Sequence, residues 1–154
     1  MIYETFNDYL SDDRLSGLNA IVLLSLKQKG RGKSYGCLGL DRFGKLIDYA
    51  FSKRIPIGMD SCSANKVLSV ISDYDNRKEI ETFIEPCESG CFSFYSDVYG
   101  NFYPCSFVEG VSGWVNGLSY KDFGSFAEIW NDERVLLFRD NLLRNNRSCP
   151  IFDV

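Results

Sequence analysis

Six cysteines and the absence of histidine limit the chemistry that this chain of 154 residues can carry out. Without histidine there is no Ser-His-Asp triad, no Cys-His pair and no histidine-ligated metal site. A conventional general base would have to be Asp, Glu, Lys or Tyr. We find no basic-then-apolar leader, and cysteines in such a chain are more often thiols or metal ligands than disulfides. The composition therefore favours thiolate chemistry, and we expect no catalytic side chain of the usual kinds.

Four of the cysteines group around one short segment. Cys87, Cys91 and Cys105 have the spacing C-x3-C-x13-C, and Cys149 follows a helical pattern. Two cysteines before a hairpin and one just after it can converge on one ion or cluster, and a fourth completes a tetrahedral set. Four thiolates suit zinc or an iron–sulfur cluster, and the spacing alone favours neither. The alternative is that all four are buried cysteines without a ligand.

The elements around these cysteines have the pattern of a hairpin followed by helices. Residues 87–105 are aromatic and alternating, with a turn at Gly100-Asn101. Residues 108–124 hold four glycines and indicate an extended loop. Ser125 and Glu128 form a capping box for the next helix. The last helix is expected to bury one face, formed by Val135, Phe138 and Leu142.

The first half of the chain alternates between helical and strand-like patterns. Residues 19–26 and 55–59 are apolar runs, and the first is typical of a strand buried on both faces. Helical spacing recurs in four places, of which two are residues 2–10 and 64–71. A third is a helix capped by Asp41 that carries Phe43, Leu46, Ile47 and Ala50. The fourth is a short helix capped by Asp75 that carries Ile80, Phe83 and Ile84. This order predicts an α/β fold with a parallel strand pair. Both strands would be edges that something must cover.

Residues 87–149 resemble the C-terminal auxiliary-cluster region of radical S-adenosylmethionine enzymes, known as SPASM and twitch domains. The resemblance is carried by Cys87, by Gly100 followed after four residues by Cys105 (GNFYPC), by FAEIWN at residues 126–131, by Arg139 and by Cys149-Pro150. It implies that Cys87, Cys91, Cys105 and Cys149 bind an auxiliary [4Fe–4S] cluster, with zinc as the alternative. It also implies that residues 1–84 are the last two βα units of a partial (β/α)6 barrel and that residues 85–154 are the cysteine-rich module.

The resemblance further suggests residues that would face a substrate. In such a barrel the C-terminal strand ends form the functional face. Arg31, in the loop KQKGRG, is a candidate to meet a carboxylate or phosphate, and Asp60 to meet a polar substrate group. Cys62 is a candidate substitute cluster ligand. The alternatives are a solvated basic loop for Arg31, a helix cap or turn for Asp60, and an ordinary cysteine for Cys62, as for Cys37.

The catalytic motif of that family, C-x3-C-x2-C, is missing from this chain. Cys87-x3-Cys91 has the first spacing, but Phe94 stands at the third position. We therefore expect no radical generation by this polypeptide alone, and S-adenosylmethionine only if another chain supplies a catalytic half. Phe152 stands where a full SPASM domain has a further cysteine, so at most one auxiliary cluster is expected.

Two functions follow as expectations. The first is a cluster-binding, substrate-positioning part of a radical enzyme that acts on a peptide or small molecule and pairs with a catalytic half or with further copies of itself. The second is a non-enzymatic protein-binding module derived from this fold, with a structural zinc. The net charge of −4, with its acidic excess in residues 85–154, argues against a general nucleic-acid binder. Because no apolar run reaches the roughly 18 residues of a membrane span, we expect a cytoplasmic protein.

Overall fold

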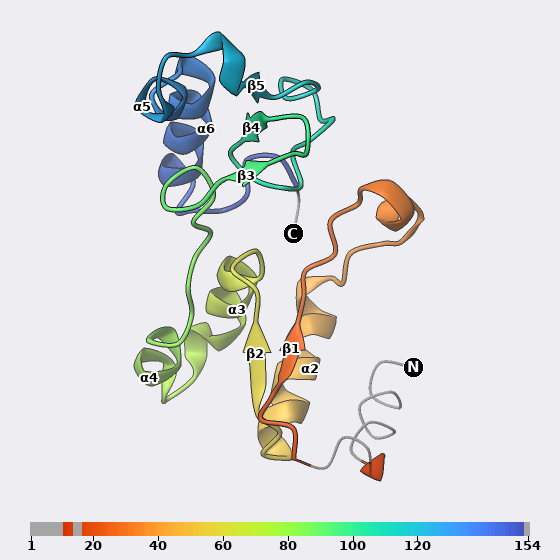
Figure 1. Ribbon diagram of the computed structural model, residues 1–154. Coiled ribbons are helices and arrows are strands. Elements are labelled where there is room, and N and C mark those ends of the chain that lie inside the picture. Colours follow the sequence, from red (N-terminus) through yellow and green to blue (C-terminus); the bar gives the residue numbers. More distant parts are fainter. Residues whose placement is uncertain (1–10, 14–16, 153–154) are drawn as a thin grey trace. The chain divides into compact units, whose positions relative to one another are not determined.

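The computed structural model describes residues 11–13 and 17–152 (Figure 1). Five α-helices and two small sheets lie in this part of the chain, which confirms the predicted mixed α/β class. The chain forms two compact units. The first consists of Met1–Ser25 and Gly36–Glu85, and the second of Leu26–Tyr35 and Pro86–Val154. The helix predicted over residues 2–10 lies outside the described residues.

The first unit contains the predicted parallel strand pair. Strands β1 (Ile21–Leu23) and β2 (Ile57–Met59) run parallel, with Ile21 opposite Ile57. Helix α2 (Leu40–Ser52) connects them and packs against the strands through Leu46 and Ala50. The apolar stripe predicted for α2 is confirmed, since its buried residues are Phe43, Leu46, Ile47 and Ala50.

The expectation that the first strand is buried on both faces is wrong. Val22 is 58% exposed and Leu24 is 74% exposed. Side chains alternate between the two faces of a strand, and only the face toward α2 buries the neighbouring Ile21 and Leu23. The strand is also shorter than the apolar run that predicted it. Helices on one face of a two-stranded sheet leave the other face open.

Two predicted helix starts differ from the observed ones. Helix α2 begins after Gly39, whose carbonyl accepts the Phe43 N–H, and Asp41 instead pairs with Lys45 at 3.0 Å. Helix α3 (Ala64–Val70) continues into the 3-10 turn η3 (Ile71–Asp73), as the spacing predicted. The short helix α4 (Arg77–Glu81) begins after Asn76 rather than Asp75. The Asn76 carbonyl accepts the first helical N–H groups, so backbone geometry decides this start.

The second unit is built on a three-stranded antiparallel sheet. Strands β3 (Tyr95–Ser96) and β4 (Asn101–Tyr103) form the predicted hairpin, with Tyr95 opposite Tyr103. A third strand, β5 (Leu118–Ser119), pairs with β4 in the segment that was predicted to be loop. It is only two residues long, too short for a period-two pattern to be visible in the sequence.

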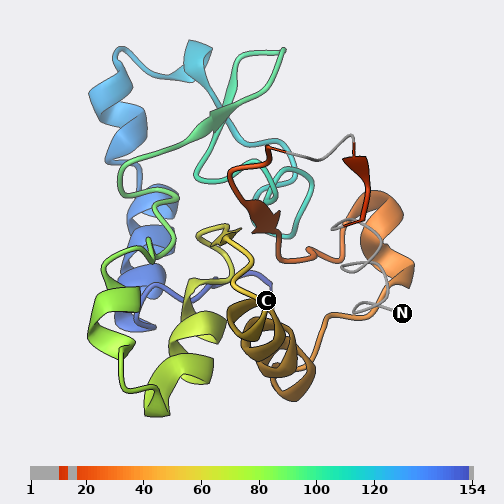
Figure 2. The ribbon, with the colours of Figure 1, turned by 90° about the horizontal axis from the view of Figure 1, so that it is seen from below.

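Helices α5 (Phe126–Trp130) and α6 (Glu133–Arg144) complete the second unit and are drawn in light blue to blue in Figure 1 and Figure 2. The capping box is confirmed, because Ser125 Oγ accepts the Glu128 N–H and donates to the Glu128 carboxylate. The buried face of α6 is the predicted one. The core of this unit consists of Phe102, Tyr103, Val108, Trp114, Leu118, Ile129, Val135 and Phe138.

Membrane-spanning helices are absent from residues 11–13 and 17–152, where no helix is both long and apolar enough to cross a bilayer.

Candidate metal centre

All four cysteines predicted to bind a metal lie in the second unit. Cys87 is buried, and Cys91, Cys105 and Cys149 are half-buried. None of the four forms a disulfide. They lie before β3, after β4 and after α6, so each is carried by a loop that the sheet or a helix holds at one end.

The segments that carry Cys87 and Cys149 are joined by Arg147. Arg147 Nε donates a 2.7 Å hydrogen bond to the Cys87 carbonyl oxygen. The Arg147 N–H donates to the Leu142 carbonyl at 2.8 Å, which ends α6 and turns the chain back. Two successive residues, Asn146 and Arg147, have positive φ in this turn. The turn therefore directs the segment with Cys149 toward the one with Cys87.

The residues that immediately precede Cys91 and Cys105, Gly90 and Pro104, are in contact. Gly90 has a φ of +69°, and a Cβ placed on it would lie 3.4 Å from Pro104 Cβ and 3.0 Å from Phe138 Cδ1. Arg139 Nε donates to the Gly90 carbonyl at 2.6 Å. Only a glycine leaves room for this approach, so the backbone before Cys91 lies directly against the residue before Cys105.

Two of the sulfur atoms accept backbone hydrogen bonds. The Phe107 N–H donates to Cys105 Sγ at 3.5 Å, and the Phe152 N–H donates to Cys149 Sγ at 3.3 Å. At metal centres, hydrogen bonds to a ligand sulfur orient the ligand and tune the reduction potential. Cys105 and Cys149 thus have local surroundings suited to ligation.

These residues fit a thiolate-bound metal in their chemistry but are not arranged as a loaded site. Four thiols, two of them with N–H donors to sulfur, are the donors that zinc and iron–sulfur clusters use. Yet nowhere in the described part of the chain do three Cys, Asp or Glu side chains lie close enough together to hold an ion. Ligation would require the four side chains to converge, which couples metal binding to the stability of this unit.

The loop between Cys91 and Cys105 is fixed by Asp97. Its carboxylate accepts N–H bonds from Tyr99 and Asn101, each at 2.9 Å, and one from Asn101 Nδ2 at 2.8 Å. Burial alone would raise the pKa of Asp97, but these hydrogen bonds outweigh burial and lower it below its ordinary value. This role of Asp97 was not predicted from the sequence, although an Asp before a Gly-Asn turn is a recognisable signal.

The three candidate substrate residues are divided between the units. Arg31 is exposed on the 3-10 helix η2 (Gly30–Ser34) of the second unit, in a segment that was predicted to be loop. Asp60 and Cys62 are half-buried in the first unit. A role in substrate binding stays a prediction for each of them.

Asp60 joins the C-terminal ends of β1 and β2. Its carboxylate accepts the N–H groups of Ser25 at 3.2 Å and Ser63 at 3.0 Å, and the Ser63 hydroxyl at 2.5 Å. The two serine hydroxyls are 2.8 Å apart. This network has the form of the turn or cap that the sequence offered as the alternative for Asp60. Ser25 and Ser63, which lie shortly after β1 and β2, were the signal for this network in the sequence.

Comparisons of the chain with protein-family models, curated proteins and solved structures gave no match. The interpretation of the site therefore rests on its own residues and geometry.

Proposed function

We propose that the second unit is an auxiliary metal-binding module, in which Cys87, Cys91, Cys105 and Cys149 hold a [4Fe–4S] cluster. The observation that carries the proposal is the pair of N–H···S hydrogen bonds to Cys105 and Cys149. Hydrogen bonds to ligand sulfurs are a regular feature of iron–sulfur centres, where they tune the reduction potential.

Two tertiary links support the same assignment. Arg147 holds the segment with Cys149 to Cys87, and Gly90 brings the segments with Cys91 and Cys105 into contact. Each link joins two of the four proposed ligands across a long stretch of sequence. A bound cluster at these thiolates would offer an iron site for a substrate or a carrier for electrons.

We further propose that the chain belongs with a radical S-adenosylmethionine enzyme as its C-terminal, substrate-positioning part. The resemblance at residues 87–149 supports this, as does the parallel β1–β2 pair with its crossover helix, the unit from which (β/α) barrels are built. Because C-x3-C-x2-C does not occur in these 154 residues, the catalytic cluster and S-adenosylmethionine would be held by protein outside them.

The experiment is anaerobic reconstitution of the chain with ferrous iron and sulfide, followed by metal and sulfide analysis and electron paramagnetic resonance. We expect about four iron and four sulfide per chain, as in a [4Fe–4S] cluster. Cys105→Ser and Cys149→Ser should lower the iron content severalfold, and Cys37→Ser should leave it unchanged. Iron near zero, or equal iron in all three variants, would overturn the cluster assignment.

A second candidate is a non-enzymatic protein-binding module with zinc in the same thiolate set. The exposure of the hairpin side chains favours it, since Phe92, Val98 and Tyr99 all lie in solvent. In this case the same metal analysis would give one zinc without sulfide, and the chain would hold zinc under air.

A further inference from the structure

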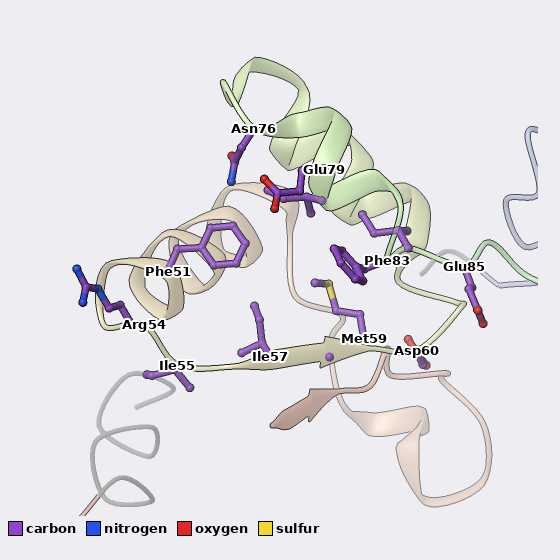
Figure 3. A pocket seen from close by; sticks show the side chains of 13 residues that line it. Phe51, Arg54, Ile55, Ile57, Met59, Asp60, Asn76, Glu79, Phe83 and Glu85 are labelled. Atoms are coloured by element: carbon purple, nitrogen blue, oxygen red, sulfur yellow. The ribbon is translucent and has the colours of Figure 1, made fainter. Parts of the chain in front are cut away.

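The first unit contains a hollow of about 460 Å³ that none of the proposed metal ligands lines. Its walls come from the end of α2, from β2, and from the segment between Asn76 and Glu85 (Figure 3). This volume is within the range of ordinary ligand sites. The apolar part of the lining includes Phe51, Ile57, Met59, Ile80 and Phe83.

One wall of the hollow is the open edge of β2. Toward β1, the Pro56 carbonyl accepts the Ile21 N–H at 2.9 Å, and the Asp60 N–H donates to the Leu23 carbonyl at 3.2 Å. Successive residues of a parallel strand point their backbone groups to opposite sides, so those of Ile57 and Met59 point away from β1. No described residue pairs with them, because β2 has β1 as its one partner in that sheet. Figure 3 shows the hollow on this side of β2.

Two aromatic side chains stand at the hollow without being buried. Phe83 follows α4 and is 81% exposed, and Phe51, near the end of α2, is 38% exposed. Figure 3 shows both rings beside β2. An exposed aromatic pair at an unpaired strand edge offers apolar contacts to an apolar side chain of an added strand.

The charges at the hollow favour a basic partner. Glu79 and Glu85 line the hollow and are exposed. With Asp60, the lining has three carboxylates and one basic side chain, Arg54. Neither Glu79 nor Glu85 forms an ion pair with a described residue. The two carboxylates are therefore available to cationic groups of a ligand, which would be attracted before contact.

We propose that this hollow binds an extended peptide segment in which apolar and basic residues alternate, and that the segment adds a strand to the open edge of β2. Its backbone pairs with the free N–H and C=O groups of Ile57 and Met59. An apolar side chain packs between Phe51 and Phe83, and basic side chains approach Glu79 and Glu85. The peptide site uses no residue of the metal centre, so a test of peptide binding is independent of the test for a cluster.

The probe is a fluorescein-labelled peptide, acetyl-Lys-Val-Lys-Val-Lys-Val-Lys-amide, whose binding is followed by fluorescence anisotropy. Two isomers each carry two N-methyl groups, one on the first and second valines and the other on the two inner lysines. Because an added strand uses the N–H groups of alternate residues, we expect one isomer to bind at least about tenfold more weakly and the other to bind nearly as the parent does. An acidic version with Glu in place of Lys should also bind at least about tenfold more weakly.

Matched variants of the protein locate the site. Phe83→Ala and the double variant Glu79→Lys, Glu85→Lys should each weaken binding of the parent peptide about tenfold. Val115→Ala and Glu133→Lys change exposed residues of the second unit and should leave it unaltered. All five substituted positions are on the surface, so circular dichroism should show retained folding.

Three results would overturn the proposal. They are absence of saturable binding of the parent peptide, equal affinity of both N-methylated isomers, and unchanged affinity in the Phe83→Ala variant. A concentration-dependent dimer that Phe83→Ala abolishes would also overturn it, because the occupant would then be a second copy of this chain.

Discussion

Arg147 Nε donates a 2.7 Å hydrogen bond to the carbonyl oxygen of Cys87, a residue 60 positions earlier in the chain. The same guanidinium lies over the Phe92 ring, 5.8 Å from its centroid. This single side chain therefore fixes the start of the cysteine-rich segment against its end. The proposed centre needs such a link, because Cys149 is separated from the other three cysteines by two helices.

Removal of this link should destabilise the second unit. We expect Arg147→Ala to lower the free energy of unfolding by about 1–2 kcal/mol, since a charged donor to a partly buried carbonyl is lost. Arg144→Ala removes only an exposed pair with Asp140 and should cost less than about 0.5 kcal/mol. Urea unfolding followed by tryptophan fluorescence reports on this unit, which holds both tryptophans, Trp114 and Trp130. Equal losses in the two variants would contradict the role given to Arg147.

The contact between Gly90 and Pro104 predicts a severe effect of a single methyl group. Gly90→Ala would place a Cβ 3.0 Å from Phe138 Cδ1 in a residue with positive φ, and we expect a loss of about 2–4 kcal/mol. Gly113→Ala is the control, because Gly113 also has positive φ but no neighbour within 4 Å. If both variants lose the same stability in thermal unfolding, the close approach at Gly90 is not important.

The sequence predicted the fold best where burial on one face decides the structure. The stripes of α2 and α6 and the parallel pair followed from periodicity, because tertiary packing acts on the same residues that make the pattern. The helix starts at Gly39 and Asn76 did not follow, since there a backbone carbonyl serves as the cap and no side chain marks it. Strand β5 is set by pairing with β4 and not by its own two residues.

The residue types of the candidate site could be predicted, but the hydrogen bonds that hold its loops in place could not. Cysteine spacing singled out the four thiols. The hydrogen bonds of Arg147 and Arg139 to backbone carbonyls depend on chain reversals far away in sequence, which no local pattern encodes. The hollow beside β2 was missed for a similar reason, because Phe51 and Phe83 belong to separate segments. The sequence predicted a helix that carries Phe83, whereas α4 ends at Glu81, before this residue.

Asp97 should make the stability of the hairpin depend on pH in a defined direction. Its hydrogen bonds hold its pKa below the ordinary value, so its contribution is complete above pH 5 or so and is lost as the pH falls through the folded-state pKa. Asp97→Asn should therefore have a lower urea midpoint than the wild type at pH 7, and the gap should narrow at about pH 3. A gap of constant size would show that the charge of Asp97 is not involved.

Tyr74 provides a second titration with the opposite sense. Burial, the hydrogen bond from its hydroxyl to Asp48 and the charge of that carboxylate raise the pKa of Tyr74 to about 12. The stability it contributes is complete below the unfolded-state value near 10 and is lost as the pH rises through 12. Ultraviolet difference titration of the wild type against Tyr74→Phe should show this late ionisation, and Asp48→Asn should move it to lower pH. If Tyr74 ionises near pH 10 in both the wild type and the Asp48→Asn variant, the assignment is refuted.

The most direct test of the central claim is residue-resolved alkylation of the cysteines in the iron- and sulfide-loaded chain, compared with the same chain after chelation. Iodoacetamide labelling is read by mass spectrometry under anaerobic conditions. The account predicts that loading protects Cys91, Cys105 and Cys149 together and that chelation restores their labelling, while labelling of Cys37 and Cys62 is the same in both samples. Cys87 is buried without a ligand and should be labelled weakly in both samples. Labelling of Cys91, Cys105 and Cys149 that does not change on loading would contradict the account.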